Sequence, residues 1–155
     1  RLRVLVADRV RPFIHVIPTP VDGIGAIELN AERVERPKLP FEYALLVEVR
    51  AQGLRIRPGR SLRLILDGDT ALLARDSVRT SWPRVDPTVR EQARYVASDT
   101  VMRQLGSAQN ARMAVRGAGW WEARRLSVEN LRVLREFVEQ QVVRDSGATG
   151  GPAPR

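Results

Sequence analysis

Hydrophobic and polar residues alternate most regularly in the run FEYALLVEVR, residues 41–50. Hydrophobic side chains occupy one parity of this run, at Phe41, Tyr43, Leu45, Val47 and Val49, and charged side chains occupy the other, at Glu42, Glu48 and Arg50. Successive side chains of a β-strand point to opposite faces of its sheet. The pattern therefore predicts a strand with one face in a core and one polar face.

The segment SLRLILDGDTALLA, residues 61–74, predicts a β-hairpin. Two runs rich in leucine flank Asp67-Gly68, and an Asp-Gly pair readily supplies the positive φ angles of a tight turn. A two-residue and a three-residue loop would both bury leucines, so the register stays open. Further strands are predicted over residues 24–29 and 89–97, and one or two short edge strands over residues 2–17.

A short helix is predicted over residues 99–105. Ser98 or Asp99 can accept the free backbone N–H groups of a first helical turn, and Gly106 can end the helix in the left-handed conformation. Residues on one side of this helix, Val101, Met102 and Leu105, are expected to be buried.

A second, amphipathic helix is predicted over residues 128–143. Ser127 is a favourable N-cap, and Leu126 can pack on Leu131 as a hydrophobic staple. Hydrophobic residues follow at helical spacing: Leu131, Leu134, Phe137, Val138 and Val142. We expect this helix to lie across a sheet.

The stretch GAGWWEARRL, residues 117–126, places two tryptophans side by side between a glycine turn and the last helix. If residues 117–119 form a three-residue turn, Val115 lies opposite Trp121 and Arg116 lies opposite Trp120. Trp121 would then face the core. Trp120 would face outward together with Glu122 and Arg124.

These elements predict an α+β fold, mainly antiparallel sheet with a short helix near 99–105 and a C-terminal helix near 128–143 packed on the sheet. We expect one domain over residues 1–144 and a disordered tail over residues 145–155. Residues 77–88 have no regular period. They are interpreted as a connection in which Trp82 fills one edge of the core.

Composition adds a strong basic bias. The chain of 155 residues has a net charge of +8, and all but one of its 26 basic residues are arginines. Arginine codons are favoured by GC-rich genomes, and the acidic residues are scattered among the arginines, so nucleic acid is an unlikely but open partner. No apolar run approaches the ~20 residues of a membrane span. Because the sequence starts at Arg1 rather than methionine, export after removal of a leader also stays open.

No stretch of the sequence carries a catalytic or cofactor-binding signature. His15 is the only histidine and there is no cysteine, so a tight metal site would need carboxylates. Asp67 and Asp69 are the best acidic candidates, but turn formation explains the first of them. No glycine-rich phosphate loop is present, and no cofactor is expected. A carboxylate-based enzyme is kept as an alternative.

Two sets of residues are candidates for binding. The first is Trp120 with Arg116 and Arg124, because exposed tryptophan and arginine are frequent at interfaces. The second is an anion-binding alternative in which arginines follow a turn and two strand ends: Arg55, Arg57, Arg60 and Arg63. This second set lacks interleaved aromatic residues, which single-stranded nucleic acid would require for stacking.

The C-terminal third, ARMAVRG, WWEARRL and SVENLRVLREFVEQ, resembles the ends of uncharacterised bacterial exported or lipoprotein-type β-rich domains, and the LILDG hairpin supports the resemblance more weakly. The resemblance implies no activity and no site residue. It favours a non-enzymatic bacterial envelope or accessory domain that binds another macromolecule. A nucleic-acid-binding module that uses arginines 50–63 is the alternative.

Overall fold

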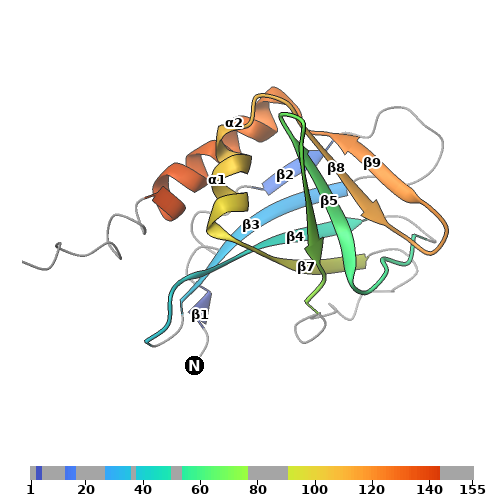
Figure 1. The fold of residues 1–155 in the computed structure, drawn as a ribbon, viewed down its shortest axis with the longest axis horizontal. Helices are drawn as coiled ribbons and strands as arrows, with labels where there is room; N and C mark the ends of the chain where they lie inside the picture. Colours follow the sequence, from blue (N-terminus) through green and yellow to red (C-terminus); the bar gives the residue numbers. More distant parts are fainter. Residues whose placement is uncertain are drawn as a thin grey trace, which may run out of the picture.

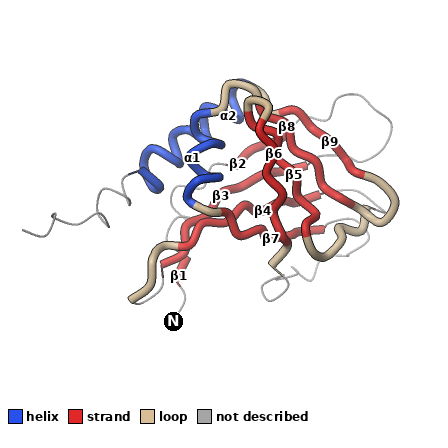
Figure 2. The backbone as a smooth tube through the Cα atoms, in the orientation of Figure 1, coloured by secondary structure: helices blue, strands red, loops and turns tan. Residues whose placement is uncertain are grey.

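The protein has an α+β fold of two antiparallel sheets and two α-helices, as the sequence predicts. The computed structural model describes residues 3–4, 13–16, 27–35, 38–49, 54–76 and 91–143. Strands of the two sheets cross one another, and helices α1 and α2 lie side by side along one flank of the strands (Figures 1 and 2). No described helix combines the length and apolar character needed to cross a bilayer.

The first sheet has five strands in the order β1-β3-β4-β7, with β2 also paired to β3. Its strands are β1 (Arg3–Val4), β2 (Phe13–Val16), β3 (Ile27–Glu35), β4 (Glu42–Val49) and β7 (Glu91–Ala97). The prediction of a short strand over residues 24–29 is wrong in extent, because β3 continues to Glu35. Glu28, Asn30 and Glu32 alternate with buried apolar residues along β3, so what reads as a charged connection is the polar face of a strand.

The second sheet has four strands in the order β6-β5-β8-β9. Its strands are β5 (Arg60–Leu66), β6 (Asp69–Ala74), β8 (Ala111–Arg116) and β9 (Trp121–Arg125). The predicted hairpin between β5 and β6 is confirmed, and its loop has two residues because Leu66 pairs with Asp69. Asp67 and Gly68 both have positive φ angles, 49° and 90°, as a twisted two-residue turn requires.

Helix α1 (Asp99–Ser107) begins as predicted, because the Ser98 side chain accepts a hydrogen bond from the Val101 N–H at 3.1 Å. The prediction that Gly106 ends the helix is wrong, since Gly106 lies inside it. A Cβ atom at Gly106 would lie 2.6 Å from the Cβ of Val138. The glycine therefore allows two helices to approach closely rather than supplying a left-handed cap.

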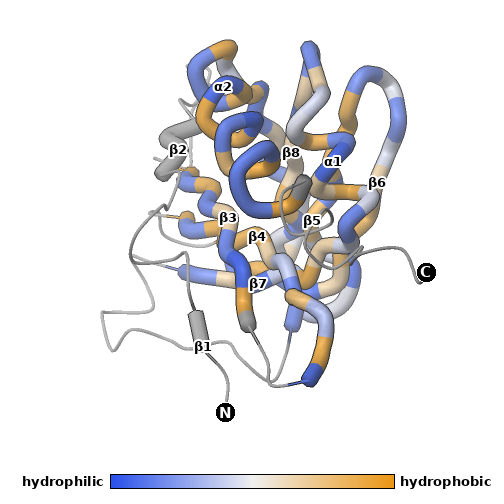
Figure 3. Tube along the Cα trace, turned by 90° about the vertical axis from the view of Figure 1, so that its left-hand side faces the viewer, coloured by the Kyte–Doolittle hydropathy of each residue, from blue (hydrophilic) through white to orange (hydrophobic). Residues whose placement is uncertain are grey.

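Helix α2 (Val128–Phe137) continues as the π-helix η1 (Val138–Val143), and together they cover the predicted residues 128–143. Ser127 and Asn130 form a capping box at its start, which satisfies two backbone N–H groups. The buried stripe of this helix joins the inner faces of both sheets and helix α1 in one hydrophobic core. Hydrophobic and hydrophilic positions alternate along the strands that line this core (Figure 3).

Candidate arginine face on the four-stranded sheet

The loop between β8 and β9 has four residues, 117–120, because Arg116 pairs with Trp121. The predicted three-residue turn is therefore wrong. The Gly117 N–H donates to the carbonyl oxygen of Trp120 at 2.8 Å, and the Ala118 N–H donates to the carbonyl oxygen of Leu54 at 2.9 Å. A Cβ atom at Gly117 would lie 2.3 Å from the Leu54 carbonyl oxygen. The loop conformation is thus set partly by Leu54, which is distant from the loop in the sequence.

The extra loop residue exchanges the two faces of β9 relative to β8. A shift of one residue in strand register moves every side chain to the opposite face of the sheet. Met113 and Val115 are buried in the core, and they pair with Arg124 and Glu122. Trp121 pairs with Arg116 and lies on the outer face of the sheet, so the prediction that Trp121 enters the core is wrong.

The three residues of the first candidate site do not share a surface. Trp120 is 46% exposed in the loop, and its Nε1 donates to Oε2 of Glu122 at 2.9 Å. Arg124 is only 4% exposed and forms an ion pair with Glu122 at 2.5 Å. Arg116 projects from the outer face. The register shift therefore separates Arg116 and Arg124, which the sequence grouped together.

The outer face of the four-stranded sheet instead gathers arginines from three strands. Arg63 comes from β5, Arg112 and Arg116 come from β8, and Arg125 comes from β9 beside Trp121. We call these four arginines with Trp121 the arginine face. The outward positions of the four strands carry no carboxylate; besides the arginine face they are Arg60, Ile65, Thr70, Leu72, Ala74, Ala114 and Ala123.

Trp121 lies close to two guanidinium groups of this face. The Cζ atom of Arg63 lies 4.7 Å from the centroid of the indole ring, and that of Arg116 lies 5.9 Å from it. Both distances fit cation–π contacts. Arg63 reaches across β8 above Ala114, its direct partner in the register, where only a methyl group has to be spanned. The contact places an aromatic ring among the arginines.

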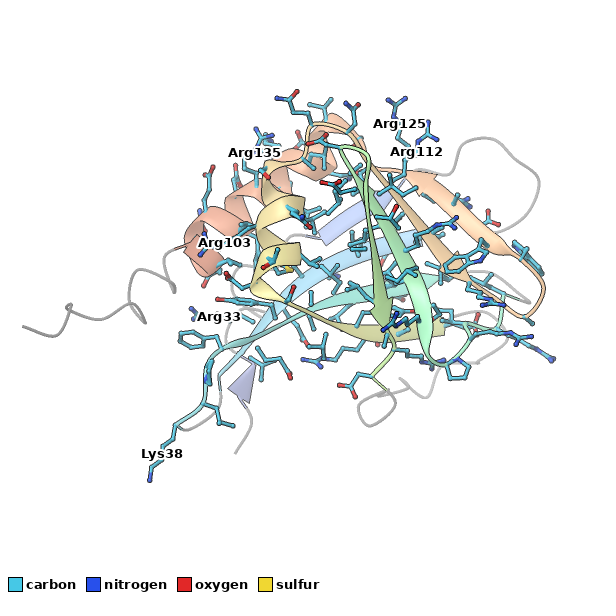
Figure 4. The ribbon with its side chains drawn as sticks, viewed as in Figure 1. Arg33, Lys38, Arg103, Arg112, Arg125 and Arg135 are labelled. Atoms are coloured by element: carbon cyan, nitrogen blue, oxygen red, sulfur yellow. The ribbon has the colours of Figure 1, made fainter. Side chains whose placement is uncertain are left out.

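Arg112 and Arg125 face each other directly across β8 and β9. Both side chains are exposed, and both project from the same end of the sheet (Figure 4). Like charges in directly opposite positions destabilise a sheet. No ion pair to either residue occurs in the described parts of the chain. This pair is therefore a place where a bound anion would relieve repulsion.

The second candidate set, Arg55, Arg57, Arg60 and Arg63, comes together only in part. Its members lie toward the end of the arginine face that holds Arg116. The Arg57 N–H donates to the Arg116 carbonyl oxygen at 2.9 Å, and its guanidinium donates to the Ala118 carbonyl oxygen at 3.1 Å. Arg60 is exposed opposite Ala74, and Arg63 belongs to the arginine face. Arg50 is outside the described residues.

Arg55 has an unusual backbone conformation for an arginine. Its φ angle is 52°, in the left-handed region that non-glycine residues rarely occupy. The carboxylate of Glu91 accepts hydrogen bonds from the N–H groups of Arg55, at 2.8 Å, and Ile56, at 3.1 Å. The buried carboxylate thus holds the segment that borders the loop of residues 117–120.

The acidic and histidine candidates have structural surroundings. The Asp67 carboxylate accepts hydrogen bonds from the N–H groups of Gln109, at 3.1 Å, and Asn110, at 2.8 Å, so it joins the β5–β6 turn to the segment before β8. Asp69 is exposed at the start of β6. His15 pairs with Glu28 in the register of β2 and β3, and its side chain is outside the described part of the structure.

Sequence reasoning missed Arg112, Arg125 and the outward direction of Trp121. The signal was present as alternation, because Arg112, Ala114 and Arg116 share one parity of ARMAVR. Alternation alone does not predict the arginine face, because the length of the loop decides which side chains of β9 lie on the same face as these three residues. The chain matches no protein family model and no curated protein, and it matches no solved structure.

Proposed function

We propose that this protein is a non-enzymatic module that binds single-stranded nucleic acid on the arginine face. The observation behind the proposal is the composition of that face: Arg63 and Arg116 lie within cation–π distance of Trp121, Arg112 and Arg125 pair at the other end of β8 and β9, and the strands supply no carboxylate at outward positions. Proteins that bind single strands combine cations that contact the phosphate backbone with aromatic rings on which bases stack. Trp121 supplies the aromatic group that residues 54–63 lack.

A single strand fits this face better than a duplex or a protein partner. In a duplex the bases are stacked inside, so an aromatic ring on an open sheet would have no base to contact. A contact surface of Trp120 with Arg116 and Arg124 is disfavoured, because Arg124 is 4% exposed. Ile65 and Leu72 lie on the same outer face and offer apolar contacts to further bases.

The decisive experiment measures the affinity of the whole chain for a fluorescently labelled 12-nucleotide single strand over a range of salt concentrations. If all four arginines contact phosphates, the slope of log K against log salt concentration should be about −3, since each contact to a single strand contributes roughly −0.7. A flat titration, or no binding at low salt, would refute the proposal.

Two variants test whether the arginine face is the binding surface. Arg112→Gln with Arg125→Gln should weaken binding and reduce the slope by about 1.4, as expected for two lost phosphate contacts. The matched control, Arg103→Gln with Arg132→Gln, removes the same net charge from exposed positions on the helices and should leave the slope close to that of wild type. Equal losses in both variants would show only a general charge effect.

Trp121→Leu separates stacking from phosphate contact. It should lower the affinity for the 12-nucleotide strand about tenfold or more, because a stacked base contributes roughly 1–3 kcal/mol. Affinity for inorganic polyphosphate, which has no bases, should stay within about twofold of wild type. Equal loss with both ligands would contradict a stacking role for Trp121.

A further inference from the structure

A cavity of about 320 Å³ lies beside the end of the arginine face where Arg112 and Arg125 meet. Arg125 belongs to both, because it lines the cavity and also projects from β9 on the outer face. The cavity lies between the start of α2 and the segment before β8, which supplies Gln109 and Asn110. A single-stranded nucleic acid with a phosphate bound to Arg112 and Arg125 would therefore place its next base near the cavity.

One wall of the cavity is apolar. Leu126 and Leu131 are nearly buried, whereas Val128 is 85% exposed. Val128 has the largest exposed fraction among the large hydrophobic side chains in the described residues. This wall has no intramolecular cover at Val128, and an apolar contact there with the flat face of a base would remove hydrocarbon surface from water.

The lining also includes two amide side chains on a fixed backbone, those of Gln109 and Asn110. Asp67 accepts the N–H groups of Gln109 and Asn110, and its own N–H donates to the Asn110 carbonyl oxygen at 2.9 Å. Their side-chain amides make no hydrogen bond within the described ranges. Asparagine and glutamine amides offer a donor and an acceptor side by side, the pattern that pairs with the edge of a nucleobase.

The start of α2 does not favour a phosphate in this cavity. The Ser127 hydroxyl accepts the Asn130 N–H at 3.0 Å, and the Asn130 side chain accepts the Ser127 N–H at 2.9 Å. Glu129 adds a carboxylate to the first turn, which repels another anion. A neutral, flat group with hydrogen-bonding edges suits the lining better than an anion.

We propose that this cavity is a base-binding subsite for the single strand held on the arginine face. Arg112 and Arg125 hold the phosphate, the adjacent base turns into the cavity against Val128, and Gln109 and Asn110 contact its edge. The subsite rests on the proposed function and adds base preference to it, which the arginines alone cannot provide because phosphates carry no sequence information.

The test compares Gln109→Ala with Asn110→Ala, as a double variant, against the matched control Gln104→Ala with Gln140→Ala on exposed helix positions. The probes are 12-nucleotide homopolymers of dA, dC and dT, and inorganic polyphosphate. Wild type should discriminate among the homopolymers by about fivefold or more, and the cavity variant should reduce this to within about twofold. The control variant should keep the wild-type preference, and polyphosphate affinity should not change.

A second pair of variants probes the apolar wall. Val128→Glu should lower homopolymer affinity about tenfold, whereas Val96→Glu, which makes the same charge change on the outward side of β7, should have an effect of less than about twofold. Equal homopolymer affinities in wild type, or unchanged preference in the amide variant, would overturn the subsite and leave the proposed function standing. Absence of any salt-dependent binding would instead refute the proposed function itself.

Discussion

At the scale of single residues, the most constrained charge is the buried guanidinium of Arg94 on β7. It donates to Glu32 at 2.5 Å, to Glu42 at 2.9 Å and to Asp76 at 2.8 Å. Burial disfavours its charged form, but the hydrogen bonds and attraction from Glu32 and Glu42 outweigh burial and raise the pKa of Arg94 above its ordinary value. The contribution of this group to stability is therefore fully present at every pH below the ordinary arginine pKa.

Replacement of Arg94 by an uncharged residue should strongly destabilise the fold at neutral pH. Arg94→Met should lower the free energy of unfolding by about 3–5 kcal/mol at pH 7, because it leaves buried carboxylates without their counter-ion. Urea denaturation of wild type and variant at pH 7 measures the deficit.

Arg132→Met is the matched control, because Arg132 also bridges two carboxylates, those of Glu129 and Glu136, but on an exposed helix surface. It should leave the free energy of unfolding close to the wild-type value, since solvent screens exposed ion pairs. A loss in Arg132→Met as large as that in Arg94→Met would contradict the explanation from burial of the Arg94 ion pairs.

At the scale of elements, the two hairpins of the four-stranded sheet differ in how far their loops depend on distant residues. Asp67-Gly68 is a local turn signal, and the two-residue loop follows from the φ preferences of these residues. The loop of residues 117–120 is instead fixed by Leu54, whose carbonyl oxygen accepts the Ala118 N–H. A local rule consequently predicts the first hairpin and gives the wrong register for the second.

Helix α1 packs closely against η1 at Gly106. Substitution of this glycine by alanine should have two opposing effects on stability. Gly106→Ala favours the helix by about 1 kcal/mol through intrinsic propensity, but its Cβ would lie 2.6 Å from the Cβ of Val138. Overpacking of this kind costs about 1–3 kcal/mol, so we expect a net loss of stability in urea denaturation. Gly119→Ala is the control, because nothing lies within 4 Å of its Cβ position. A more stable Gly106→Ala variant would show that α1 and η1 can separate at little cost.

At the scale of the whole molecule, the two sheets handle their charged residues differently. On the polar face of the five-stranded sheet, Glu28, Glu32 and Glu48 are buried, and Arg94 pairs with Glu32 and Glu42. On the outward strand positions of the four-stranded sheet, arginines alone carry charge. The positive charge of this face attracts an anionic polymer during its approach.

Binding on that face should stabilise the entire fold. A 12-nucleotide single strand at a free concentration of 100 Kd should add about 2.7 kcal/mol of stability and raise the midpoint of thermal unfolding by about 5–10 °C for a chain of this size. The shift should disappear at high salt and should be smaller, at the same concentration, in the Arg112→Gln, Arg125→Gln variant. A shift that persists at high salt would contradict a mainly electrostatic contact.

The sequence by itself determined the fold class, both helix starts and most strands. These features depend on alternation, on the Asp67-Gly68 turn and on the capping residues Ser98 and Ser127, which act through neighbours in the chain. The tertiary structure decided the register of β8 and β9, and with it the outward direction of Trp121 and the gathering of four arginines on one face. A one-residue shift of β9 exchanges its two faces, and the stretch WWEARR has no alternation clear enough to choose between the two registers. Here the hydrogen bonds and close approach of Leu54 at Gly117 and Ala118 do so, and no local sequence signal reports them.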